Sequence, residues 1–359
     1  MGEIQVSETK LITDRLPLHY ACLTDDFDTI KLLVTRGVLV NFPDANGVLP
    51  MHIACENSSV DAVQLLLSNG ANLEDPDANG KLPIHYACQN YMYGDDLVAF
   101  LIEKKVKLDV PDTRGRLPIH YSCENLGSNV LRLLLAHNVK LDVPDASGWL
   151  PIHYASKNGH VDKVKILIAK NAQVNIPDAS KKTPLHYACE NWDTSVVKLL
   201  LAKGAAVNYC DENDRLPIHY ACENRWCSRD ILILLMENRA RLNIPDRNGR
   251  MPIHCACDNV NIDTLKLLIE NLATVNVPDK KVQLPLHLAC KKGNTHMVKL
   301  LVENGAILDI PDIDGWLPIH YASENRFVDT LGVLIGFGAA SDVPDVNGRL
   351  PTHYMRRKL

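Results

Sequence analysis

Apolar side chains recur along the chain in short runs with helical spacing. In one such run Val161, Val164 and Leu167 stand three residues apart, which places them on one face of an amphipathic helix. A second type of run begins at a proline, as at Pro151, because proline costs no hydrogen bond in the first turn of a helix. This run ends near Asn158, since asparagine tolerates the left-handed conformation that closes many helices. The pattern predicts pairs of short helices joined by a turn.

The helix pairs belong to a repeat that is marked by every proline in the chain. One proline opens the first helix of each repeat, and its spacing is 33 residues, or 35 in two places. A second proline precedes an aspartate, and Asp-x-x-Gly is the residue preference of a type I turn. With Asp44 as position 1 of its repeat, Gly47 is position 4 and Pro50 is position 7. The helix-opening prolines are Pro17, Pro50, Pro83, Pro118, Pro151, Pro184, Pro217, Pro252, Pro285, Pro318 and Pro351.

These repeats divide the chain into an N-terminal tail, residues 1–10, and a repeat array, residues 11–359. One turn and two helices cannot bury an apolar face alone, so neighbouring repeats are expected to stack. The expected repeats are 11–43, 44–76, 77–111, 112–144, 145–177, 178–210, 211–245, 246–278, 279–311 and 312–344, followed by a partial repeat, 345–359.

From Asp178 to Cys189 the repeat comes close to the pattern Asp-x-x-Gly-x-Thr-Pro-Leu-His-x-Ala-Ala of the ankyrin family. The chain resembles this family from about residue 11 onward. The resemblance implies an all-α fold, the ankyrin-repeat α-solenoid, with a turn and two antiparallel helices in each repeat. Lys181 departs from the pattern, cysteine mostly replaces the second alanine, and Leu or Met replaces the threonine except at Thr183. The last change removes a hydroxyl N-cap, at an expected cost of about 1 kcal/mol for each helix.

The composition argues against several classes of partner and compartment. The net charge of −5 creates no strong field toward nucleic acid or an anionic membrane. The longest aliphatic run, 231–236, is too short to span a bilayer, and the N-terminus has no apolar signal segment. Cysteines are odd in number, and most share one repeat position, which favours reduced thiols. We expect a monomer in the cytoplasm or nucleus that binds neither nucleic acid nor membrane.

Histidine and cysteine are frequent, but their positions argue against metal or nucleophile chemistry. Most histidines share position 9 and most cysteines share position 12, so stacking places each set in a row. A zinc ion needs four ligands around one point, and a nucleophile needs a base within hydrogen-bond distance. His254, Cys255 and Cys257 are close in sequence, but neighbours at these spacings point in different directions on a helix. We expect no catalytic residue, no cofactor and no metal, and therefore no enzyme.

The resemblance implies that the turn tips and first helices line a groove, with positions 2, 3, 5, 10, 13 and 14 facing it. Position 10 is mostly tyrosine, position 5 is mostly basic, and position 13 is mostly acidic. Where position 13 is lysine, position 5 is never basic, so the two charges are expected to be coupled within a repeat. We predict that arginine stacks on tyrosine and that a partner binds this surface. The alternative is a solvated surface repeated by duplication. The candidate contacts are Arg116, Arg215, Arg250, Tyr154, Tyr187 and Tyr220.

The tryptophans lie at positions that the repeat framework does not use. Two stand at position 5 and two in the turn between the helices, which two extra residues lengthen in repeats 77–111 and 211–245. Large aromatic side chains at exposed, variable positions are typical of interface hot spots. The alternative is that they fold back over their own neighbours. The candidates are Trp149 and Trp316 at position 5, and Trp192, Trp226, Tyr91, Tyr93 and Phe327 in the turn.

These observations favour a non-catalytic scaffold or adaptor that binds a protein partner through its concave groove and its aromatic helix-turn edge. The alternative is a targeting or substrate-receptor subunit of a multi-subunit enzyme such as a ubiquitin ligase, which rests on family analogy alone. A further hypothesis concerns asparagines that follow valine, with leucine eight residues earlier, a context that resembles ankyrin asparagines that undergo hydroxylation. They are Asn41, Asn175, Asn208 and Asn276.

Overall fold

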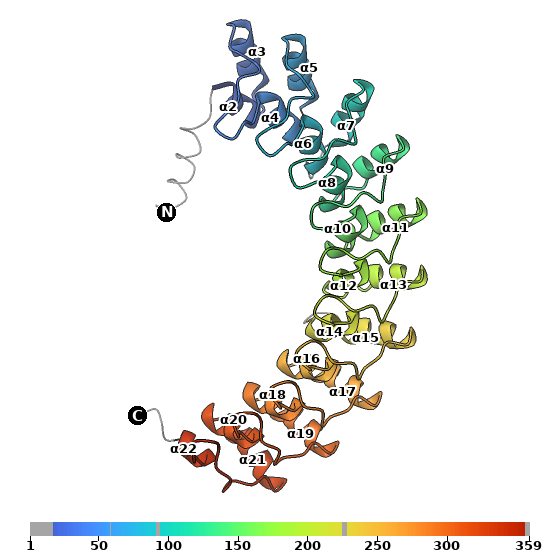
Figure 1. Ribbon diagram of the computed structural model, residues 1–359. Helices are drawn as coiled ribbons and strands as arrows, with labels where there is room; N and C mark the ends of the chain where they lie inside the picture. The colour runs from blue at the N-terminus through green and yellow to red at the C-terminus, as the bar shows by residue number, and fades with distance from the viewer. Residues whose placement is uncertain (1–16, 58, 91–93, 225–227, 356–359) are drawn as a thin grey trace. The chain divides into compact units, whose positions relative to one another are not determined.

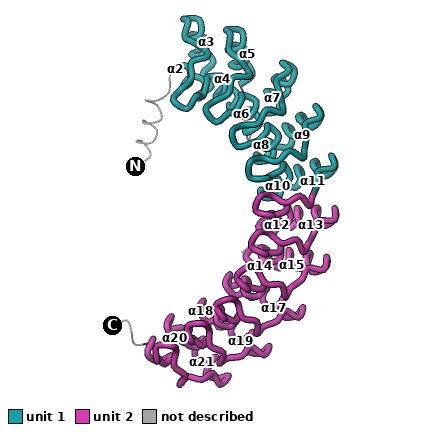
Figure 2. The backbone as a smooth tube through the Cα atoms, viewed as in Figure 1, with its two compact units in different colours: residues 1–173 teal, residues 174–359 magenta. Residues whose placement is uncertain are grey.

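The computed structural model describes residues 17–57, 59–90, 94–224 and 228–355. It divides into two compact units, residues 1–173 and 174–359, which are described separately (Figure 2). In the described ranges all regular secondary structure is helical, as expected for an α-solenoid. Short helices that begin at a proline alternate with second helices in both units (Figure 1).

The first helix of each repeat begins at the proline that marks it in the sequence. In the first unit these helices are α2 (Pro17–Leu23), α4 (Pro50–Glu56), α6 (Pro83–Gln89), α8 (Pro118–Glu124) and α10 (Pro151–Lys157). In the second unit they are α12 (Pro184–Ala188), α14 (Pro217–Glu223), α16 (Pro252–Asp258), α18 (Pro285–Lys292), α20 (Pro318–Glu324) and α22 (Pro351–Met355).

The second helices follow after a short turn. In the first unit they are α3 (Phe27–Thr35), α5 (Val60–Ser68), α7 (Gly94–Glu103), α9 (Asn129–Ala136) and α11 (Val161–Ala169). In the second unit they are α13 (Ser195–Ala202), α15 (Ser228–Glu237), α17 (Ile262–Glu270), α19 (Thr295–Glu303) and α21 (Val328–Gly336). None of the helices in the described ranges is long and apolar enough to cross a membrane.

Within each unit, helices of the same kind pack side by side and form two layers (Figure 1). For example, α4 packs on α6 in the first unit and α18 packs on α20 in the second. Each first helix also packs on the second helix of its own repeat, as α10 does on α11. The core lies between the layers, where Val164 and Leu167 of α11 are fully buried. The predicted amphipathic second helix is therefore confirmed.

The turn at the start of each repeat forms as the Asp-x-x-Gly pattern predicts. The Gly115 amide donates to the Asp112 carbonyl over 2.9 Å, and the Asp112 carboxylate accepts the amides of Arg114 and Arg116 over 2.8 Å each. The tip of the turn also bonds to the next tip, because the Ala146 amide donates to the Arg114 carbonyl over 2.8 Å. Bonds of this kind join the tips within each unit into a ladder.

Glycine at position 4 is required by the close approach of neighbouring tips. Gly47 has a φ of +71°, and a Cβ atom there would lie 2.8 Å from the Ala78 backbone nitrogen. In three repeats another residue takes this position and keeps a positive φ: Lys181, Asp214 and Val282. The left-handed conformation is costly for a β-branched residue, so the turn at Val282 is strained.

The histidine at position 9 caps the first helix. The Leu216 amide donates to Nδ1 of His219 over 3.0 Å, so Nε2 carries the proton, and Nε2 lies 3.2 Å from the Arg250 carbonyl oxygen of the next repeat. The same capping bond forms in other repeats where leucine or methionine replaces threonine. The same bond also forms at Thr183, whose hydroxyl makes no capping bond to the helix backbone, so the expected loss of a hydroxyl N-cap in the other repeats does not arise.

The asparagine at position 14 does not adopt the left-handed conformation that we expected. Asn57 has φ −83° and ψ 0°, and Asn125 is extended, with φ −78° and ψ 177°. The Asn125 side-chain amide donates to the Cys88 carbonyl of the preceding repeat over 2.9 Å. The residue after the asparagine is the one with positive φ in some repeats, as at Val260. The prediction was wrong because asparagine is used here for its amide donor and not for its backbone freedom.

Repeats 77–111 and 211–245 each contain two extra residues, and we expected both of them in the turn between the helices. The helix lengths show a different distribution. α7 and α15 each have 10 residues, whereas α5 and α11 have 9. One extra residue therefore lengthens the second helix, and only the other lies between the helices.

Candidate functional site

The face formed by the first helices carries the charged and aromatic rows. The Arg116 guanidinium lies 4.4 Å from the centre of the Tyr121 ring, whose hydroxyl donates to Asp112 Oδ2 over 2.6 Å. Arg116 also pairs with Asp112 at 3.1 Å and with Glu124 at 3.8 Å. The predicted stacking and charge coupling are both confirmed in this repeat. Burial and the hydrogen bond to Asp112 raise the pKa of Tyr121 well above its usual range, so the hydroxyl remains a donor.

The second unit forms the same charge pairs in three consecutive repeats. The pairs are Lys182–Glu190 at 3.2 Å, Arg215–Glu223 at 2.7 Å and Arg250–Asp258 at 3.1 Å. The Arg215 guanidinium also lies 4.3 Å from the centre of the Tyr220 ring. Because Arg116, Arg215 and Arg250 each have a carboxylate in their own repeat, a partner that bound them would compete with an intramolecular ion pair. Their contact with a partner stays a prediction.

The candidate tyrosines offer little free surface. Tyr187 and Tyr220 are 5% and 7% exposed, and their hydroxyls donate to Asp178 and Asp211 over 2.5 Å each. Tyr154 is half-buried and makes the equivalent bond. These rings mainly support the charged row above them. Their contact with a partner also stays a prediction.

Trp149 and Trp316 are half-buried against neighbouring tyrosines. The Trp149 ring centre lies 4.9 Å from that of Tyr154. The Trp316 ring centre lies 4.9 Å from that of Tyr321 and 4.7 Å from that of Tyr354. This geometry matches the alternative interpretation, in which these aromatic rings fold over their own neighbours. Contact of Trp149 and Trp316 with a partner stays a prediction.

Trp192, in the turn between α12 and α13, is the most exposed aromatic side chain among the described residues. It is 70% exposed. Phe327, before α21, is half-buried, and its ring occupies the space that a Cβ at Gly293 would need. Outside the described residues lie Trp226, Tyr91 and Tyr93.

Sequence reasoning missed one residue of the same turn in the first unit. Leu126 is 77% exposed and directly follows Asn125, just as Trp192 directly follows Asn191. The sequence could have revealed Leu126, because it is a large apolar residue at position 15 of its repeat, the position that Trp192 occupies in its own. Val260 occupies the same position in its repeat and is 43% exposed. We call Leu126, Trp192 and Val260 the position-15 residues.

The cysteines at position 12 and most of the histidines at position 9 are buried and uncharged, as expected of residues with a structural role. His254, Cys255 and Cys257 are all buried on α16. In the part of the chain that the structure describes, no three histidine, cysteine or acidic side chains could hold a metal ion. Burial raises the pKa of the Cys255 thiol to about 12 and lowers the pKa of His219 to about 4. At neutral pH the thiol is therefore protonated and the imidazole is neutral.

The candidate hydroxylation sites link neighbouring repeats. The Asn175 side chain donates to the Gly204 carbonyl over 3.0 Å and accepts the Ala206 amide over 2.7 Å. An enzyme that modified such a side chain would act on a hydrogen-bonded group, and the modification stays a prediction. The other sites also donate to the next repeat: Asn41, Asn208 and Asn276.

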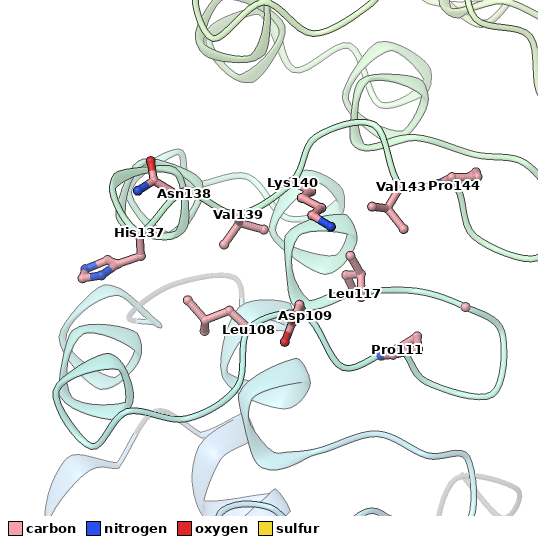
Figure 3. A pocket seen from close by; sticks show the side chains of 11 residues that line it. Leu108, Asp109, Pro111, Leu117, His137, Asn138, Val139, Lys140, Val143 and Pro144 are labelled. Atoms are coloured by element: carbon pink, nitrogen blue, oxygen red, sulfur yellow. The ribbon is translucent and has the colours of Figure 1, made fainter.

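A cavity of about 610 Å³ lies between two loops of the first unit, where this asparagine is replaced (Figure 3). Asp109 stands at the equivalent position, and a carboxylate has no hydrogen to donate to the facing chain. Leu108 and Asp109 come from the loop after α7, and Val139 and Lys140 from the loop after α9.

Comparison with known protein families agrees with this architecture. A sequence model described as ankyrin repeats in three copies matches residues 5–77, 84–178, 130–211, 185–279 and 253–347. Comparison with curated proteins gave no match. Repeats of this kind generally mediate protein–protein interactions. The matches cover most of the chain, and the chain belongs to the ankyrin-repeat family.

Proposed function

We propose that the chain is a non-catalytic scaffold or adaptor that binds a protein partner in the cytoplasm or nucleus. Family membership supports the class of partner, because ankyrin repeats generally mediate protein–protein interactions. The described cysteines are free thiols, which supports a reducing compartment. No described residue favours the alternative of a ubiquitin-ligase substrate receptor.

The observation that carries the proposal is the exposure of the position-15 residues. Leu126, Trp192 and Val260 are 77%, 70% and 43% exposed in turns that are otherwise polar. Burying apolar surface is favourable by roughly 25 cal/mol per Å², and folding leaves these side chains in water. Exposed tryptophan is also the residue type most often found at the centre of interface hot spots. Within each unit, the ion pairs of the first-helix face would then form a polar rim beside these turns.

Replacing Trp192 by alanine is expected to raise the Kd for the partner at least tenfold. A tryptophan at a hot spot is worth about 2 kcal/mol or more, whereas an exposed side chain contributes little to stability. The partner is first identified by affinity purification and crosslinking mass spectrometry on the full chain. The Kd of the purified partner is then measured by titration calorimetry, and the melting temperature of each variant is recorded.

Leu272→Ala is the matched control, because Leu272 is 85% exposed but follows the second helix α17. An unchanged Kd for Trp192→Ala, with crosslinks confined to other surfaces, would remove the position-15 residues from the interface. Ligase subunits among the purified proteins would favour the receptor alternative. Failure to recover any crosslinked protein would count against the scaffold proposal itself.

A further inference from the structure

The repeat 279–311 lacks the ion pair that the preceding repeat forms on the first-helix face, between Arg250 and Asp258. Its position 5 is Gln283 and its position 13 is Lys291, near the end of α18. The Gln283 amide donates to the Tyr321 hydroxyl over 2.6 Å and to Asp312 Oδ2 over 3.2 Å, so it is used inside the unit. The Lys291 ammonium lies 5.9 Å from the centre of the Tyr321 ring, and no described carboxylate lies at salt-bridge distance from it.

Three further lysines lie on the same face of this repeat. Lys280 and Lys281 are at the tip of the turn, Lys292 ends α18, and all are exposed. The end of the turn and the end of the first helix share a face, because the side chains of positions 5 and 13 meet in repeats 211–245 and 246–278. Within the described residues only Lys292 of the four has an ion pair, with Asp258 at 2.8 Å. The lysine cluster is defined as Lys280, Lys281, Lys291 and Lys292.

Exposed aliphatic side chains adjoin the lysine cluster. The Ile313 amide donates to the Lys281 carbonyl oxygen over 3.0 Å, so the next turn tip lies directly beside it. Ile313 is 64% exposed. Val346 occupies the following tip, where its amide donates to the Asp314 carbonyl over 3.4 Å, and it is 69% exposed. Position 2 is small in several other repeats, as at Ala179, so these two tips offer an apolar surface that those tips lack.

We propose that the lysine cluster, together with Ile313 and Val346, binds an acidic segment of the protein partner. Carboxylates of the segment pair with the lysines, and an aliphatic or aromatic side chain of the segment covers Ile313 and Val346. This inference rests on the proposed function and adds the chemistry of the ligand. Three ammonium groups without an internal carboxylate provide the charge complementarity, and the adjoining aliphatic tips provide apolar area.

The surroundings favour a peptide over a phosphate backbone. Exposed carboxylates of Asp314 and Glu324 lie in the following repeat, and the chain has a net charge of −5. An evenly charged nucleic acid would have to pass these carboxylates, whereas a peptide can place its acidic side chains individually. The aliphatic tips also offer nothing to a phosphate oxygen. A protein segment is therefore the ligand that uses both parts of the surface.

The test measures binding of a fluorescein-labelled peptide that alternates glutamate and leucine to the full chain by fluorescence anisotropy. The triple variant Lys280→Gln, Lys281→Gln, Lys291→Gln is expected to raise the Kd about tenfold, since each exposed ion pair contributes modestly and three are removed together. Added salt is expected to weaken binding to the unmodified chain more than to the variant. Ile313→Ser is expected to raise the Kd without changing this salt dependence.

The matched control is Lys198→Gln, Lys203→Gln, Lys299→Gln, which removes the same charge from the second-helix layer. Equal affinity of the triple variant and this control would overturn the inference. Tighter binding of a DNA oligonucleotide or a phosphatidylserine vesicle than of the peptide would also overturn it. If the natural partner is lost on Trp192→Ala but kept by the lysine variant, this inference fails and the proposed function stands. If both variants leave partner binding intact, this inference and the assignment of the position-15 residues to the interface fail, whereas the scaffold proposal stands.

Discussion

Lowering the pH from 6.5 to 5 is expected to destabilise the array steeply. Burial lowers the pKa of His85, His186 and His219 from 6.5 to about 4. In this window the unfolded chain binds a proton at each of these histidines and the folded chain does not, so stability falls as the pH falls. Each histidine contributes about 1.4 kcal/mol per pH unit, and about 3 kcal/mol once the pH reaches its folded pKa.

The structural cause is the capping bond. Nδ1 of His219 accepts the Leu216 amide, and a protonated imidazole has no acceptor left for that amide. Urea denaturation followed by circular dichroism at pH 7.5, 6.5, 5.8 and 5 measures the slope before most carboxylates titrate. His219→Gln is expected to make the slope shallower, whereas the exposed His296→Gln is expected to leave it unchanged. A free energy of unfolding that stays constant over this window would contradict the prediction.

Replacing Lys163 by methionine is expected to stabilise the chain at pH 7 by about 1–3 kcal/mol, because a buried charge is costly to desolvate. Lys163 on α11 is 1% exposed, and its ammonium donates to the carbonyl and to the side-chain oxygen of Asn125. Met297 occupies the equivalent position of another repeat and is fully buried there, so methionine fits this site. The Asn125 oxygens lose their donor, which reduces the gain, while the Asn125 amide keeps its bond to Cys88.

The pH dependence expected from Lys163 has the same sign as that of the histidines but lies at higher pH. Burial lowers its pKa from 10.5 to about 8. Between these values the unfolded chain holds a proton that the folded chain has lost, so stability rises as the pH rises from 8 to 10.5. Below pH 8 the full cost of the buried charge is present. Lys163→Met is expected to remove this rise, and the exposed Lys165→Met on the same helix is expected to keep it. Loss of stability at pH 7 together with an unchanged rise would contradict the prediction.

The fold could be predicted from the sequence because local signals and the repeat agree. Pro151 starts a helix, Val164 and Leu167 give it a partner with an apolar face, and the spacing of prolines requires neighbours to stack. The coupling of charges at positions 5 and 13 likewise predicts the contact between Arg116 and Glu124 that the structure shows. These features could be predicted because each depends on residues a short distance apart in one repeat.

Features that depend on the next repeat could not be predicted in the same way. The conformation of Asn125 follows from a carbonyl in the preceding repeat, and the burial of Lys163 follows from the oxygens of Asn125. The surface beside Lys281 appears only when the tip at Ile313 is placed next to it. The exposure of Trp192 is also a property of the turn geometry, since a turn can either cover an aromatic ring or leave it in water.

The row of buried cysteines gives nearly every repeat its own chemical reporter. Nine of the described thiols are shielded by packing, whereas Cys210 is exposed. An alkylating reagent can therefore reach a shielded thiol only during a local opening of its own repeat, and the rate of alkylation at each position measures the free energy of that opening. Peptide mass spectrometry of a single native-state labelling series would rank the repeats by local stability without introducing a probe by mutation.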